Sequence, residues 1–531
     1  MTWPRSVLVL TVVAAALWAG APDSAGAGDY HSATEALERV QETRIDEAEL
    51  VLKGMPLGTP ARAWAEASIL FHRGRYSAAR DALPEAAPGE PDGLRRLRIR
   101  IEHAHKATLG MMERAVGNFL YRFEGGPDAI LVDYAVEALE GQRAAMEEIL
   151  GATPSQPVVV EFFPTVERFV LATGLPMEWV ETTNTVAVCK WDRLMVLSPL
   201  NMPRGYPWKD TLAHEYVHLI LSQASRNRAP IWFHEGSAKV LETRWRDPKG
   251  GEFLDPWGES LLARALDEGA LVDFEAMHPS MAALPSSEIA SLAFAQVAYA
   301  VDYILDSVGP RGYRQIVEET ALYGDVLRAL DLVLGRSLGS FEDRYQAHMR
   351  SQGLRIRTQV AGFDLKLEAG AAGVSDSEGV ALDPVLLDHR RMQDHTRIGD
   401  LLRLRGHRRA ALIEYERAEL AGPYHSPALA NKKARTLRAL GRADAARQIL
   451  EETVDLYPEF APTIALLCEL SAATEEHQRT ADLAQRALAI NPFDPKIHLH
   501  LIGALTGLGD TDGVKHEQRV LQILADHLGR H

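Results

Sequence analysis

The sequence predicts a mainly helical, multidomain chain in which a small α+β domain lies between two helical regions. Its 531 residues suffice for two to four domains with sizeable cores. Strand-like segments precede two apolar helices near the middle, and turn residues recur about every 34 residues near the end. The predicted order is a signal peptide (1–27), a helical region (28–117), the α+β domain (118–353), a linker (354–391) and a second helical region (392–531).

The first 27 residues have the pattern of a secretory signal peptide. Arg5 precedes an apolar run from Val7 to Ala19, and Ala25 to Ala27 form a cleavage site of the A-x-A type. We therefore expect cleavage after Ala27 and export, to a bacterial periplasm. An uncleaved N-terminal membrane anchor is the alternative, and no membrane span is expected after signal removal.

Composition narrows the expected partners. A formal net charge of −16 argues against nucleic acid and anionic membrane surfaces. The two cysteines, Cys189 and Cys468, fall in different predicted domains, so neither a disulfide framework nor a Cys-rich zinc site is expected.

The region from Asp29 to Lys106 is predicted to form helical hairpins. Small and aromatic residues recur around Trp64–Ala67 and Gly74–Ala79. In this spacing the region resembles one tetratricopeptide repeat with an irregular partner before it.

From Asn118 onward the periodicity changes to that of a mixed α+β domain. Residues Ile130–Leu150 have apolar spacing near 3.6 and predict a helix. A β-branched run predicts a strand at Pro157–Phe163, and strands are also expected at Phe119–Phe123, Thr185–Cys189 and Leu194–Leu197.

The strongest functional signal is the stretch Asp210–Trp245, which contains the pattern HExxH. In a helix, His214 and His218 lie about 40° apart around the axis, so both imidazoles can bind one metal ion. Glu215 is rotated by about 100° and is better placed as a base acting on a metal-activated water. A second predicted helix, Ile231–Leu241, supplies Glu235 as the third ligand. Two imidazoles and one carboxylate predict a catalytic zinc site with one Zn²⁺ per chain.

The segment WFHEGSAKVLE around Glu235 resembles the WLNEGFASYVE type of segment in the aminopeptidase N family. The whole stretch is similar to the peptidase MA-like domain of gluzincin metallopeptidases, and a zincin-like fold is what this resemblance implies. The family also has a tyrosine that stabilises the oxyanion, and here Phe294 occupies its position. Tyr299 is the candidate substitute; other conceivable donors are Tyr206, Tyr303 and His234.

Two further features refine the expected site. Glu242 lies two helical turns after Glu235, and we expect its carboxylate to orient a ligand histidine. The segment that anchors a free substrate amine in aminopeptidases has no match before His214, which leaves endopeptidase activity as the expectation.

Beyond a Gly-rich, acidic linker stretch at Glu368–Gly379, the chain repeats itself. Prolines recur at spacings of 35 and 34 residues, and glycines at 35 and 68 residues, with Glu475 at the intermediate step. The landmarks are Pro423, Pro458, Pro492, Gly406, Gly441 and Gly509. This recurrence resembles three to four tetratricopeptide repeats, which stack into an α-solenoid whose concave face binds extended peptides or partner proteins.

Together these features predict an exported zinc metallopeptidase that hydrolyses a polypeptide substrate, with Glu215 as general base. Two alternatives remain open. One is a scaffold protein whose zincin domain has lost catalysis, which Phe294 favours and the intact HExxH pattern opposes. The other is an amidase that acts on cell-wall peptides.

Overall fold

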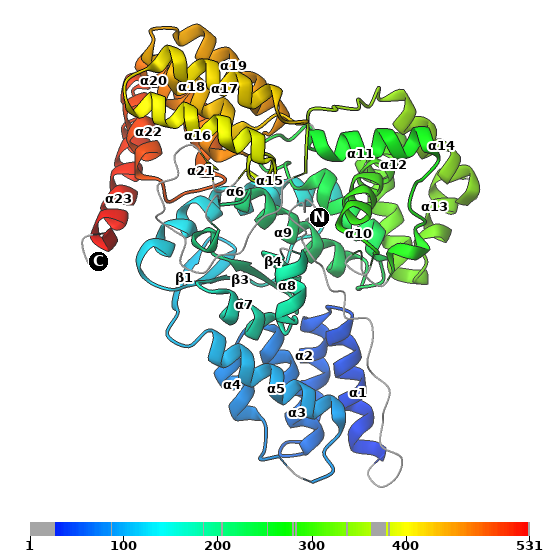
Figure 1. The fold of residues 1–531 in the computed structure, drawn as a ribbon. Helices are drawn as coiled ribbons and strands as arrows, with labels where there is room; N and C mark the ends of the chain where they lie inside the picture. The colour runs from blue at the N-terminus through cyan, green and yellow to red at the C-terminus, as the bar shows by residue number, and fades with distance from the viewer. Residues whose placement is uncertain are drawn as a thin grey trace.

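The structure, a computed structural model, describes residues 27–528 except 87, 184, 203–204, 252, 279–280, 282–283, 336–337, 363–378 and 381–382. Most of the described residues are helical and surround a small mixed sheet (Figure 1). The prediction of a mainly helical chain that contains a small sheet is therefore confirmed. The predicted signal peptide up to Gly26, and the predicted linker stretch from Glu368 to Glu378, lie outside the described residues.

The N-terminal helices pack together around Trp64 and Phe71 and dock onto the sheet. The hydroxyl of Tyr76 donates a hydrogen bond to Glu161 Oε1 at 2.5 Å, and Arg193 Nη1 donates to the carbonyl oxygen of Phe71 at 3.1 Å. These helices are α1 (Ala27–Gln41), α2 (Ile45–Gly54), α3 (Pro60–His72), α4 (Tyr76–Ala82) and α5 (Asp92–Ala107).

The sheet has the strand order β1-β2-β3-β5-β4. Its three inner strands are parallel, and the two edge strands pair antiparallel with their neighbours. The strands are β1 (Met112–Val116), β2 (Phe119–Phe123), β3 (Val158–Phe163), β4 (Ala187–Lys190) and β5 (Arg193–Leu197). All four predicted strands are present within two residues of their expected bounds. No strand was predicted at β1, because its mostly exposed residues offer no apolar face to recognise.

The middle of the chain adds helices on both sides of this sheet, and short 3₁₀ helices connect some of them. The helices are α6 (Ala129–Leu150), α7 (Val166–Thr173), α8 (Met177–Thr183), α9 (Trp208–Ala224), α10 (Ile231–Leu241), α11 (Pro256–Glu268), α12 (Ser287–Tyr323), α13 (Val326–Leu334) and α14 (Leu338–Ser351); the 3₁₀ helices are η1 (Gly126–Asp128), η2 (Pro199–Asn201) and η3 (Glu275–Met277).

Among the described residues, α12 is the one helix whose length and composition would allow it to cross a membrane. Its apolar window is 56% buried, and its residues belong to the largest hydrophobic core. Core helices of soluble proteins can have the same length and apolar composition, so these two properties are weak support for a membrane span. The helix is interrupted at Gly309, where ψ is −179°, just before Pro310.

The C-terminal array, α15–α23, consists mainly of consecutive helices that pack against each other (Figure 1). Gly406, Gly441 and Gly509 end helices with φ of 82°, 76° and 79°, and Glu475 takes the same place with φ of 55°. The predicted recurrence is thus present as a recurring left-handed turn. The helices are α15 (Pro384–Asp388), α16 (Arg390–Leu404), α17 (Arg408–Leu420), α18 (Pro427–Ala439), α19 (Ala443–Leu456), α20 (Ala461–Ala473), α21 (His477–Leu488), α22 (Pro495–Leu508) and α23 (Thr511–Leu528).

The C-terminal array contacts the segment that leads into α9. The backbone N–H of Tyr206 donates to the carbonyl oxygen of Ile490, and Trp208 Nε1 donates to that of Leu488, both at 3.1 Å. Gly205 makes this approach possible, because a Cβ there would lie 2.0 Å from the Ile490 oxygen. The array is therefore joined directly to the helix that carries HExxH.

We expect Gly205→Ala to reduce the free energy of unfolding by about 1–3 kcal/mol more than a matched control, since the added methyl group overpacks this contact. Gly269→Ala is that control. Gly269 has φ of +66°, against +69° at Gly205, but no atom lies within 4 Å of its Cβ position. Thermal unfolding of both variants measures the difference, and equal losses would contradict a tight contact at Gly205.

Candidate metal centre

Helix α9 carries His214, Glu215 and His218 through the interior of the protein. From Trp208 to Leu221 all its residues are buried except the half-buried Asp210. The helix ends where Arg226 and Asn227 adopt positive φ angles of 53° and 57°. Apolar residues on every side of the helix thus explain why its polar residues are enclosed.

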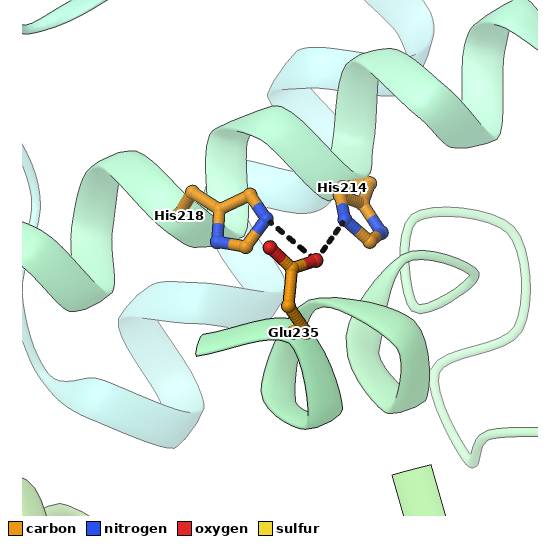
Figure 2. Close-up of side chains that lie close together, drawn as sticks. All are labelled: His214, His218 and Glu235. Carbon is orange, nitrogen blue, oxygen red and sulfur yellow. Dashed lines mark ion pairs between the residues drawn. The ribbon is translucent and has the colours of Figure 1, made fainter. Parts of the chain in front are cut away.

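Helix α10 brings Glu235 to the two histidines. Glu235 Oε2 lies 3.6 Å from Nε2 of His214 and 3.6 Å from Nε2 of His218. Figure 2 shows both imidazoles on one side of α9, facing the carboxylate that projects from α10. One ligand atom from each of the three buried residues lies within 4.8 Å of the others, so the three predicted ligands form a group that could hold a metal ion.

The position of α10 depends on a close crossing with α12. A Cβ at Gly236 would lie 2.3 Å from the carbonyl oxygen of Val297, so only glycine fits there without displacement. One residue on, Ser237 Oγ accepts a hydrogen bond of 2.6 Å from the hydroxyl of the buried Tyr313. The contacts of Gly236 and Ser237 therefore fix the position of α10, and with it the point on α9 that the Glu235 carboxylate faces.

Glu242 contacts a ligand histidine, as its spacing predicts. Its Oε2 lies 2.8 Å from Nδ1 of His214, and its Oε1 accepts a hydrogen bond of 2.6 Å from Lys239 Nζ. Burial would raise the pKa of Glu242, but Lys239 and His214 lower it below its usual range. The ionised carboxylate accepts a hydrogen bond from Nδ1–H of His214, which leaves Nε2 directed at Glu235.

His218 has a different partner, which the sequence analysis did not identify. Its Nδ1 lies 3.4 Å from Nδ1 of His234, a fully buried residue. His234 is a conceivable oxyanion donor from its sequence, but in the structure its ring contacts Nδ1 of His218, whereas Glu235 lies nearest Nε2 of the same imidazole. The place of His234 immediately before Glu235 gives no signal of this contact, because adjacent residues of a helix lie about 100° apart around the axis.

The charges of the three ligand side chains favour a cation, either a proton or a metal ion, in the space between them. Burial would lower the pKa of His214, yet Glu235 and Glu242 raise it to about 9. Burial would raise the pKa of Glu235, yet His218 and His214 lower it to about 2. Because the carboxylate stays ionised, it attracts a proton to His214, and a bound metal cation would displace that proton.

The donor atoms themselves fit a metal ion. Among the described residues, Nε2 of His214 and Oε2 of Glu235 are buried and have no hydrogen-bond partner. Buried polar atoms without partners are rare in folded proteins, because each costs free energy. An ion held by these atoms would satisfy both, and nitrogen and carboxylate donors suit a divalent transition metal.

Glu215 lies beside the three ligands without belonging to their group. Both of its carboxylate oxygens are buried. Burial raises its pKa to about 8; His214 and the backbone of Cys189 in β4 oppose this rise, while Glu235 adds to it. A pKa shifted toward neutrality suits a group that exchanges protons beside the ligands.

Of the residues considered for the oxyanion, Phe294, Tyr299 and Tyr303 lie on α12, and Tyr206 precedes α9. The ring of Tyr299 packs edge-on against Phe253, with 4.9 Å between ring centroids. The hydroxyl of Tyr206 donates to the carbonyl oxygen of Leu197, and Tyr303 packs against Phe341. Phe294 is half-buried against the main core. A role for Tyr299 as oxyanion donor stays a prediction.

A second group of metal-ligand atoms lies between α12 and α14. Asp302, Asp306 and His348 bring three such atoms within 4.8 Å of one another. These residues are half-buried or exposed, and His348 Nε2 lies 3.2 Å from Asp302 Oδ2. Exposed acidic groups of this kind are common without an ion, so this group carries no functional assignment.

No protein-family model matches this chain, and none of the curated proteins matches its sequence.

We expect Glu242→Gln to weaken Zn²⁺ binding about 10- to 100-fold, because the amide holds Nδ1 of His214 less firmly than a carboxylate does. Competition with a chromophoric chelator measures the affinity. Glu416→Gln, an exposed change on α17, is the control and should leave affinity unaltered. Unchanged affinity in Glu242→Gln would refute an orienting role.

Proposed function

We propose that this chain is a zinc-dependent metallopeptidase of the gluzincin type, with a peptidase MA-like domain followed by tetratricopeptide repeats. The observation that carries the proposal is the buried group of His214, His218 and Glu235 with Glu215 beside it. Two imidazoles and one carboxylate form a donor set of catalytic zinc sites, and this set favours zinc over neighbouring divalent metals. One zinc ion per chain is expected.

The proposed reaction is hydrolysis of a peptide bond. Zinc held by the three side chains would supply Lewis-acid activation of water and of the scissile carbonyl. Glu215 takes the proton from the attacking water at its carboxylate and returns it to the leaving amine. Glu242 and His234 keep the two imidazoles in the orientation that presents Nε2 to the metal.

The architecture supports this reading of the domains. A small sheet precedes the HExxH helix, and its edge strand β4 contacts α9, as expected for a zincin-like domain. A polypeptide substrate would lie extended along such an edge. The paired helices and recurring turns of the C-terminal array support tetratricopeptide repeats, whose concave face would bind a partner protein. The N-terminal signal would direct the enzyme to a bacterial periplasm.

A catalytically inactive scaffold is the second candidate, and two observations favour it. Phe294 has no hydroxyl to donate to an oxyanion. His214, Glu215, His218 and Glu235 are each at most 2% exposed, so a substrate would reach them only after a local movement. An amidase acting on cell-wall peptides would use the same residues and differ only in substrate.

We expect Glu215→Gln to lower peptide cleavage by at least about 100-fold while it preserves one zinc per chain, since the amide cannot accept a proton. His214→Ala should lose both zinc and activity. Metal analysis and digestion of an unbiased peptide library, run on the same samples, measure the two properties.

The outcomes separate the candidates. Cleavage that needs zinc and Glu215 supports the peptidase. Zinc without cleavage of any peptide supports the scaffold, and cleavage of cell-wall peptides alone supports the amidase. A wild-type protein without zinc would exclude the metal centre itself.

A further inference from the structure

A cavity of about 590 Å³ lies where the N-terminal helices meet the sheet. Its walls come from the turn between α3 and α4, the end of α5 and the strands β1, β2 and β3; no residue of the candidate metal centre lines it. We call it the Arg122 cavity. The lining residues that matter for its chemistry are Arg75, Ser77, His105, Glu113, Arg122 and Gln156.

Arg122 is a buried cation whose hydrogen bonds use two of its five N–H donors. The residue is 8% exposed, its Nε donates to Glu113 at 2.8 Å, and its Nη1 donates to Glu161 at 3.0 Å. The guanidinium also lies 5.0 Å from the ring centroid of Tyr76, which fixes its plane. Nη2 has no hydrogen-bond partner in the described part of the chain. This donor is therefore left for a ligand in the cavity.

Arginine is the commonest charged residue in the lining, which contains Arg73, Arg75 and Arg122 but one carboxylate, that of Glu113. Arg73 is balanced by Asp46 and Glu49, and Arg122 by Glu113 and Glu161. Arg75 is exposed and forms no ion pair with any described residue, so its charge is unmatched. The guanidinium of Arg75 is therefore available to pair with an anionic ligand.

Neutral donors complete the lining. Ser77 Oγ lies 3.3 Å from Nδ1 of His105, and Gln156, which precedes β3, is exposed and also lines the cavity. Glu113 is the only acidic group among the described lining residues, and Arg122 already occupies it. The volume exceeds that of a bare ion and falls in the range of small-molecule pockets.

We propose that the Arg122 cavity binds an oxyanion, the carboxylate or phosphate group of a small ligand, independently of the metal centre. Guanidinium groups match the planar carboxylate and the phosphate oxygens with paired donors, and charge-assisted hydrogen bonds of this kind are the strong ones. Arg122 supplies the fixed donor from the floor, and Arg75 supplies the second charge from the rim.

The test is isothermal titration calorimetry of the full-length protein with three probes: inorganic phosphate, acetyl-Ala-Ala-Ala with a free carboxylate, and the same peptide as its C-terminal amide. We expect the free acid or phosphate to bind, and the amide to bind at least about tenfold more weakly. Arg75→Gln should weaken binding about tenfold, since it removes a charged donor. Arg80→Gln, an exposed change on the same helix outside the cavity, is the matched control.

Binding of phosphate alone would identify a phosphate-bearing ligand, and binding of the peptide acid alone a carboxylate. Repeating the titration with a metal chelator distinguishes this cavity from the metal centre, since binding here should not change. The proposal is overturned if no probe binds, if Arg75→Gln binds like the parent protein, or if the chelator abolishes binding. A failed peptidase assay would leave these results unaffected.

Discussion

Charged and polar side chains enclosed in the protein interior impose the constraint on which the rest of the structure depends. His214, His218 and Glu235 lie where water does not reach, and an unpaired charge there costs far more free energy than most single contacts contribute. Glu242 and Lys239 continue the chain of opposite charges from His214 toward the surface. Helices α9 and α10 must therefore meet in the one arrangement that pairs these groups.

The parts of this arrangement that arise from local sequence were predictable. HExxH sets the spacing of two imidazoles on one helix, and the bounds Ile231–Leu241 of the second helix agree with the structure. The contact between Glu242 and His214 also follows from helical spacing, because two turns bring Glu242 back to the face of Glu235. Strands β2 and β3 were recognisable because most of their residues are β-branched or aromatic, and β4 and β5 because short apolar runs precede the HExxH helix.

What could not be predicted depends on contacts between distant segments. The exposed strand β1 lacks an apolar pattern and is held by its pairing with β2. The site of His234 beside His218 needs the angle between two helices, which no spacing rule supplies. The close crossing of α10 and α12 at Gly236 could not be predicted either, because a glycine has no side chain that would suggest a partner. The Arg122 cavity joins residues from five separate elements.

The hydrogen bond between Trp208 and Leu488 also limits the order in which parts of the chain can fold during synthesis. The two residues are 280 positions apart, and the indole of Trp208 is fully buried in the finished structure. Translation adds about 5–20 residues per second, so the partner of the indole is made roughly 14–56 s later. During that interval the C-terminal array is not yet present to bury the first turn of α9. The HExxH helix is thus among the last parts of the chain to reach its final surroundings, although it is made before the chain is half complete.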